Sequence, residues 1–144
     1  MQLSEHFNLA EMTVSHNAAR LGIDNTPSGE ALEALTYTAE QMEKVRVILG
    51  NFPITINSAY RNIAVNKLAG SKSVKSQHTK GEAVDFICPK FGNPRKIVEA
   101  IIASDLKYDQ VILEFDSWVH ISFKREGNRM SSLIIDKAGT RQFA

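Results

Sequence analysis

The sequence is poor in cysteine, lacks a long apolar run and has almost no net charge, and each absence excludes a class of protein. Cys88 is the only cysteine among 144 residues, so neither an intrachain disulfide nor a cysteine-rich zinc site can form. No apolar stretch approaches the roughly 20 residues that a membrane span needs. The 17 basic and 16 acidic residues give a net charge of +1, which argues against a dedicated nucleic-acid or membrane-surface binder.

The remaining composition is that of one globular domain, which we expect to occupy residues 1–144. Hydrophobic residues make up 43% of the chain, enough for a self-sufficient core. The segment Met1–His6 has no basic stretch followed by an apolar run, so it does not resemble a signal peptide. We therefore expect synthesis in the cytoplasm.

Hydrophobic periodicity and turn residues predict a mixture of helices and strands. In chain order they predict one or two short helices within 7–20, a long helix from Thr26-Pro27 to Leu49, a strand at 53–58, a helix at 61–69, a loop at 71–80, a strand at 83–87, a helix from Asn93-Pro94 with Ile97, Val98, Ile101 and Ile102 buried, a hairpin of 110–115 with 118–123, and a last strand at 132–135. Helices before and between the strands, together with the hairpin, predict an α+β fold with a small, mainly antiparallel sheet.

A histidine and an aspartate stand seven residues apart around the predicted strand at 83–87. His78 lies in a polar loop, and Asp85 interrupts an otherwise apolar strand. A charge on such a strand needs a partner, and a metal ion held by a neutral imidazole would supply one. The alternative is that Asp85 pairs with a lysine and His78 is an ordinary surface residue. The spacing alone leaves both interpretations open.

The predicted hairpin places a second histidine beside a second carboxylate. Trp118, His120 and Ser122 alternate with apolar residues along one strand, as Glu114 does along the other. A three-residue loop, 115–117, pairs Glu114 with Trp118 and brings Glu114 diagonally next to His120. A two-residue loop would turn Glu114 to the wrong face. The pattern therefore favours the longer loop.

Two histidines, an aspartate and a free glutamate match the requirements of a catalytic zinc site. Such sites use three protein ligands and leave a position for water. A carboxylate that does not bind the metal can then take the proton from the water and pass it to the leaving amine. His78, Asp85 and His120 suit the ligand roles, and Glu114 suits the role of the base.

At these residues the sequence resembles the zinc D-Ala-D-Ala carboxypeptidase family, and most closely its small, phage-associated branch of peptidoglycan-cutting endolysins. Residues 76–85 match the motif Ser-x-His-x-x-Gly-x-Ala-x-Asp in full. Residues 118–120 form the Trp-x-His strand, and residues 58–61 look like the family's Ser-x-Tyr-Arg segment. The similarity extends over about 7–123. The resemblance implies a zinc fold like that of the hedgehog signalling domain.

The resemblance also implies roles for individual residues. One zinc ion would be held by His78, Asp85 and His120, while Arg61 would bind a substrate carboxylate or the oxyanion of the reaction. Ser76 would form a hydrogen bond behind the ligands. From its position on the His120 face, Trp118 would line the substrate site or serve only in packing, and Tyr60 would belong to the core or to the wall of the substrate site.

The catalytic acid departs from the usual family pattern. Many members place it three residues before the last histidine, where this chain has Ser117. The related hedgehog domain carries its glutamate six residues before the histidine, which favours Glu114 as the base and leaves Asp116 as the alternative.

The expected function is hydrolysis of a peptide bond in bacterial peptidoglycan by a zinc metallopeptidase, as in a phage endolysin. The bond could be that of an L-Ala-D-Glu endopeptidase, a D,D-endopeptidase or a D-Ala-D-Ala carboxypeptidase. We expect a monomer that binds peptidoglycan peptides, binds no nucleic acid, does not insert stably into membranes, and reaches the wall after release from the host cytoplasm. The alternative is a non-catalytic zinc-containing binding domain.

Overall fold

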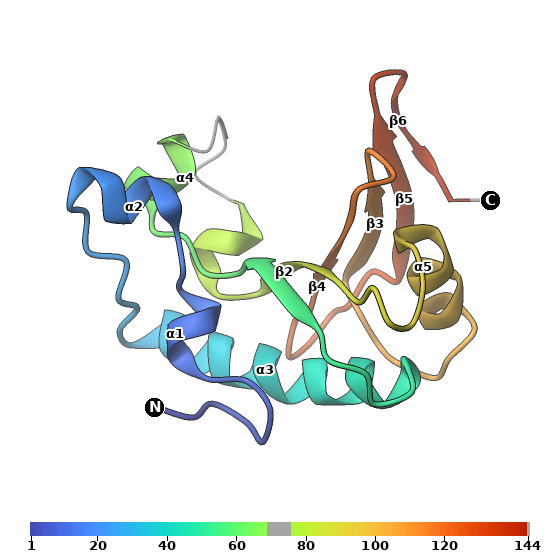
Figure 1. The fold of residues 1–144 in the computed structure, drawn as a ribbon, viewed down its shortest axis with the longest axis horizontal. Helices are drawn as coiled ribbons and strands as arrows, with labels where there is room; N and C mark the ends of the chain where they lie inside the picture. Colours follow the sequence, from blue (N-terminus) through green and yellow to red (C-terminus); the bar gives the residue numbers. More distant parts are fainter. Residues whose placement is uncertain (69–75, 144) are drawn as a thin grey trace.

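The computed structural model describes residues 1–68 and 76–143, which form an α+β fold around one six-stranded sheet (Figure 1). The helical elements are α1 (Leu9–Met12), α2 (His16–Leu21), α3 (Glu30–Ile48), α4 (Ile63–Leu68), the 3₁₀ turn η1 (Gln77–Lys80) and α5 (Pro94–Ile102). The strands are β1 (Thr55–Ser58), β2 (Ala83–Ile87), β3 (Gln110–Glu114), β4 (Trp118–Ser122), β5 (Ser131–Asp136) and β6 (Gly139–Gln142). Their order is β1-β2-β4-β3-β5-β6, and only the β3–β5 pair is parallel among these described strands. The predicted fold class is confirmed.

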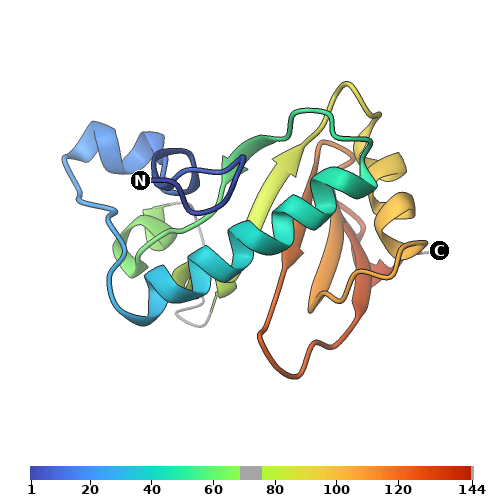
Figure 2. The same cartoon turned by 90° about the horizontal axis from the view of Figure 1, so that it is seen from below.

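The two longest helices, α3 and α5, cover one face of the sheet, and Figure 2 shows α3 crossing it. The alternation of side chains along the strands decides which groups enter this core. On β2, Val84 and Phe86 are fully buried in it, so Asp85 between them points to the opposite face. The same alternation buries Val119 and Ile121 of β4 and turns His120 away from the core. The polar groups of neighbouring strands therefore share the face that these helices do not cover.

Helix α3 begins at Glu30, so the prediction of a start at Thr26-Pro27 is wrong. Gly29 is its N-cap, without a side-chain cap, and the Thr26 amide instead donates to Asp24 Oδ1 at 2.9 Å. The preceding segment stays non-helical because the carboxamide of Asn25 is used elsewhere. It donates to the carbonyls of Thr13 and Tyr60, at 2.9 and 3.0 Å.

Other element boundaries differ modestly from the prediction. Strand β1 begins at Thr55 and α4 at Ile63, and residues 69 and 71–75 of the predicted helix and loop lie outside the described residues. The end of the predicted loop forms η1. Ile102, predicted to be buried, closes α5 and is 40% exposed. Strand β6 was not predicted, because all four of its residues are exposed and show no apolar alternation.

Gly81 allows the turn η1 to lie directly against α3. It adopts φ +77°, and a Cβ at this position would lie 2.5 Å from the carbonyl oxygen of Ala31. Thr38 Oγ1 of α3 donates to the Gly81 carbonyl at 2.7 Å, which fixes the turn there. A residue with a side chain would have both a strained φ and a clash with the backbone.

Replacing Gly81 by alanine should therefore destabilise the fold strongly. We expect Gly81→Ala to lower the free energy of unfolding by about 2–5 kcal/mol, from φ strain plus overpacking. Gly127→Ala is the matched control, because Gly127 has φ +78° but open space around its Cβ position. It should lose only about 1–2 kcal/mol, from the φ strain alone. Urea unfolding measures both, and equal losses would contradict the close contact with α3.

Candidate active site

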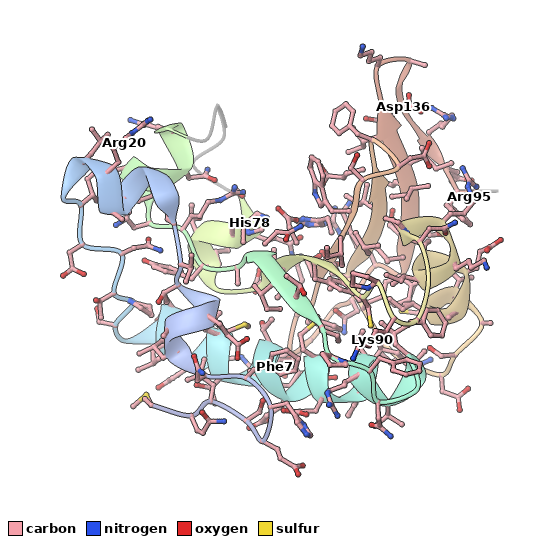
Figure 3. All side chains as sticks on the ribbon, in the orientation of Figure 1. Phe7, Arg20, His78, Lys90, Arg95 and Asp136 are labelled. Atoms are coloured by element: carbon pink, nitrogen blue, oxygen red, sulfur yellow. The ribbon has the colours of Figure 1, made fainter. Side chains whose placement is uncertain are left out.

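Three elements bring His78, Asp85 and His120 together on the face of the sheet opposite α3 and α5. η1 supplies His78, β2 supplies Asp85, and β4 supplies His120, which is the direct cross-strand partner of Asp85. One ligand atom from each residue lies within 4.8 Å of the others. Figure 3 shows His78 between α4 on one side and the strands β3 and β4 on the other.

The Asp85 carboxylate lies between the two imidazole rings. Its Oδ1 is 2.9 Å from His120 Nδ1, and its Oδ2 is 3.3 Å from His78 Nε2. The opposite nitrogen of the His78 ring, Nδ1, is 2.7 Å from the carbonyl oxygen of Ala59. Because a carbonyl can only accept, Nδ1 carries the proton and Nε2 faces Asp85 with its lone pair. A backbone acceptor behind a histidine is the usual way to orient a metal ligand.

The electrostatics keep Asp85 and His78 in the protonation states that bind a cation. Burial alone would raise the pKa of Asp85, but the hydrogen bond from His120 and the neighbouring imidazole of His78 hold it well below its usual range. Burial lowers the pKa of His78, although the charge of Asp85 opposes the shift. At neutral pH the cluster therefore offers a carboxylate and a neutral imidazole.

The donor set fits zinc, which prefers histidine nitrogen and carboxylate oxygen in sites with three protein ligands. A second histidine–carboxylate group among the described residues, Glu5, His6 and Glu43, is mostly exposed. There the Glu43 carboxylate already accepts from Ser4 Oγ and the His6 amide, both at 2.6 Å. That group ties the N-terminal segment to α3.

The β3–β4 hairpin has the predicted register, with Glu114 opposite Trp118 and Ile112 opposite His120, so this prediction is confirmed. Glu114 Oε1 consequently lies 3.9 Å from His120 Nδ1. Burial and the charge of Asp85 raise the pKa of Glu114, while His120 and Arg61 oppose the shift. The structure thus places a basic carboxylate beside the three candidate ligands.

Asp116, the alternative base, lies in the turn of the hairpin. It has φ +52° and its side chain is exposed. The hydrogen bonds and ion pairs of the described residues link it to none of the three candidate ligands. Its position therefore differs from that of Glu114, which lies on the strand beside them.

Arg61 follows β1 and borders the cluster. Its backbone amide donates to the His78 carbonyl at 3.1 Å, so the two residues are held together through the main chain. Burial lowers the pKa of Arg61, while the charges of Asp85 and Glu114 oppose the shift. Its buried Nε has no hydrogen-bond partner among the described residues, which leaves a donor for another molecule.

The remaining predicted residues surround this group. Ser76 Oγ accepts from the His78 amide at 3.3 Å and caps η1, so Ser76 supports the turn rather than the imidazole ring. Tyr60 is 8% exposed and precedes Arg61. Trp118 packs against Phe115 with ring centroids 5.7 Å apart, and its buried Nε1 has no partner among the described residues.

Two residues that support the site were not predicted from the sequence. Asn25 is buried and clamps the segment around Arg61, because it binds the Tyr60 carbonyl and accepts from the Asn62 amide at 2.9 Å. Its position in a turn-rich stretch of the sequence gave no indication of this role. Asp109 is fully buried just before β3, and a charge beside an apolar strand is the signal that also singled out Asp85.

The Asp109 carboxylate is held by three donors from one arginine and one from a glutamine. Arg129 donates from its amide and Nε to Oδ1, at 2.9 and 3.0 Å, and from Nη2 to Oδ2 at 2.6 Å. Gln77 Nε2 donates to Oδ2 at 3.0 Å. Burial alone would raise the pKa of Asp109, but the hydrogen bonds from Arg129 and Gln77 and the charge of Arg129 lower it to about 2.

Comparison with known proteins identifies the family. The sequence model of the family Peptidase M15 matches residues 5–122, so the chain belongs to this family of zinc D-Ala-D-Ala carboxypeptidases. The match confirms the resemblance drawn from the motifs and defines the protein as a peptidase of a zinc-dependent family. No curated protein gives a significant match to the chain.

The lowered pKa of Asp109 implies that the fold loses stability in acid. Its pKa rises from about 2 in the folded state to the ordinary 3.8 on unfolding, so the ionised carboxylate stabilises the fold above pH 4, and this contribution disappears as the pH falls through 2. The difference in unfolding free energy between wild type and Asp109→Asn should therefore shrink by about 2 kcal/mol between pH 5 and pH 2. Urea unfolding across this range measures it, and a constant difference would contradict the assignment.

Proposed function

We propose that the protein is a zinc peptidase that hydrolyses a peptide bond in the stem or cross-link peptides of bacterial peptidoglycan. The observation that carries the proposal is the grouping of three candidate ligands with Glu114, whose Oε1 lies 3.9 Å from His120 Nδ1. A carboxylate that lies beside the ligands without being one of them is the group that a general base requires. The family match supports the same chemistry.

The ion would be held by His78 Nε2, the Asp85 carboxylate and His120 Nδ1. When bound, zinc supplies Lewis acidity, which lowers the pKa of a water molecule and polarises a carbonyl group. Glu114 accepts the proton released when water attacks the scissile carbonyl and donates it to the leaving amine. Its position beside the candidate ligands, without being one of them, suits both transfers.

Arg61 and Trp118 offer the two buried donors that lack partners among the described residues. We assign Arg61 Nε–H to the oxyanion or to a substrate carboxylate, for which a guanidinium is well suited. Trp118 Nε1–H is assigned to a substrate carbonyl, and its ring adds apolar contact beside the packed Phe115. A bound peptide would therefore satisfy groups that the protein alone leaves unpaired.

The biological setting that we propose is that of a phage endolysin, which is made in the host cytoplasm and reaches the wall after release. No helix of the described part of the chain is long and apolar enough to cross a membrane. We propose a monomer that recognises peptidoglycan peptides through this site and binds no nucleic acid. A non-catalytic zinc-binding domain is the second candidate, and the presence of both Glu114 and Arg61 favours the enzyme.

Digestion of purified peptidoglycan by the zinc-loaded protein tests the proposal, with the products identified by mass spectrometry. New amino termini in stem peptides indicate an L-Ala-D-Glu endopeptidase, severed cross-links a D,D-endopeptidase, and free D-Ala a carboxypeptidase. Any of these outcomes supports peptidoglycan hydrolysis. Zinc-loaded protein that releases nothing from cross-linked and uncross-linked walls would favour the binding domain.

Replacing each of the two candidate bases by its amide gives the sharpest test of the mechanism. Glu114→Gln should lower kcat/KM by about 10²–10⁴-fold, because the amide cannot accept the proton, while one zinc ion per chain is retained. Asp116→Asn is the matched control and should keep wild-type activity within a few fold. Hydrolysis rates and the zinc content of both variants are measured together. An inactive Asp116→Asn beside an active Glu114→Gln would transfer the base role to the turn.

A further inference from the structure

The Gln77–Asp109–Arg129 network lies outside the proposed catalytic steps, yet it joins the two parts of the site. Gln77 stands next to His78 in η1, and its side chain reaches Asp109 Oδ2 at 3.0 Å. The Asp109 side chain is completely buried, and Arg129 neutralises its charge from the loop between β4 and β5. A buried and fully hydrogen-bonded carboxylate is a rigid anchor.

The backbone of Asp109 is fixed where three strands meet. Its amide donates to the Ser122 carbonyl at 2.8 Å, and its carbonyl accepts from the Ser131 amide at 3.0 Å. Ser122 belongs to β4, two residues after His120, so the anchor is part of the same sheet that carries Asp85 and His120. Gln77 therefore connects the turn of His78 to the strands that hold the other two candidate ligands.

The turn itself needs such a connection. A single 3₁₀ turn of four residues has poor internal hydrogen-bond geometry and is not stable alone. Thr38 of α3 donates to the carbonyl of Gly81 at the end of the turn. His78 is hydrogen-bonded to the Ala59 carbonyl and the Arg61 amide, both after β1.

Gly81 and Glu82 join the turn to β2, and the Phe123 amide after β4 donates to the Glu82 carbonyl at 2.9 Å. The contact with Asp109 adds a side-chain connection from the turn itself to a residue whose backbone is bonded to β4.

We propose that Asp109 is a positioning residue which, through Gln77, holds His78 at the correct distance from Asp85 and His120 and so sets the metal affinity of the site. The proposal rests on the proposed function, since it assumes that these residues bind zinc. Arg129 contributes by keeping the buried carboxylate ionised and oriented. Residues that orient metal ligands typically change metal affinity by about 10–100-fold when they are lost.

The test replaces Gln77 by methionine, which keeps the side-chain length and removes the donor. Gln77 is only partly buried, and Asp109 retains its contacts with Arg129, so the variant should fold. We expect its zinc dissociation constant, measured by competition with a chromophoric chelator, to rise about tenfold or more. The thermal unfolding midpoint of the metal-free protein should shift by only a few degrees.

A control and a second variant separate positioning from general stability. Arg141→Met removes a second bidentate arginine–aspartate pair, with Asp136 on β5, and should leave zinc affinity unchanged. Asp109→Asn should weaken zinc binding, and adding Gln77→Met to it should weaken binding little further, because both changes break one connection. If the two substitutions each raise the zinc dissociation constant independently, so that their effects multiply in the double variant, the proposal is overturned.

The outcomes also distinguish this proposal from the proposed function. Wild-type zinc affinity in folded Gln77→Met would overturn the role of Asp109 and leave the peptidase intact. Zinc-loaded wild type without hydrolytic activity, combined with weakened binding in Gln77→Met, would overturn the peptidase and support the positioning role. Failure of the wild type to bind zinc would overturn both.

Discussion

The site is organised around one buried carboxylate on an otherwise apolar strand. Asp85 lies between two fully buried residues, and its charge is tolerated because imidazole rings flank it from two other elements. Pairing β2 with β4 supplies His120, and the docked turn supplies His78. The strand alternation that buries the neighbours of Asp85 in the core also turns the carboxylate toward the open face.

The hydrophobic core and the candidate site lie on opposite faces of the sheet. Helices α3 and α5 lie against the sheet (Figures 1 and 2) and form the core with the apolar sides of the strands. The polar sides of β2, β3 and β4 form the site. The turn η1 belongs to both parts, since Gly81 places it against α3 and Gln77 connects it to Asp109. This double attachment explains how a short segment can hold a candidate metal ligand in a fixed position.

The sequence predicted the parts of the structure that depend on local patterns. The hairpin register followed from the alternation of Glu114 and His120 with apolar residues, and the structure confirms it. The start of α3 was mispredicted because Thr26-Pro27 has the local form of a helix start, whereas the segment is non-helical and Asn25 makes tertiary hydrogen bonds. Strand β6 was missed because both its faces are exposed.

The supporting contacts of the site were beyond sequence reasoning, because they join residues that are distant in the chain. Gln77 and Asp109 are 32 residues apart, and the Ala59 carbonyl that orients His78 is a backbone group without any sequence signature. The motif could indicate which residues bind a metal. It could not show how the protein fixes their separation.

X-ray absorption at the zinc edge of the purified, zinc-loaded protein tests the central claim most directly, because it reports the atoms bound to the ion. We expect two imidazole ligands, from His78 and His120, with the remaining ligands oxygen and no sulfur. The Asp85→Ala variant should lose the tightly bound ion, while His6→Ala should give the wild-type spectrum. A sulfur ligand from Cys88, or a wild-type spectrum that persists in Asp85→Ala, would contradict the account.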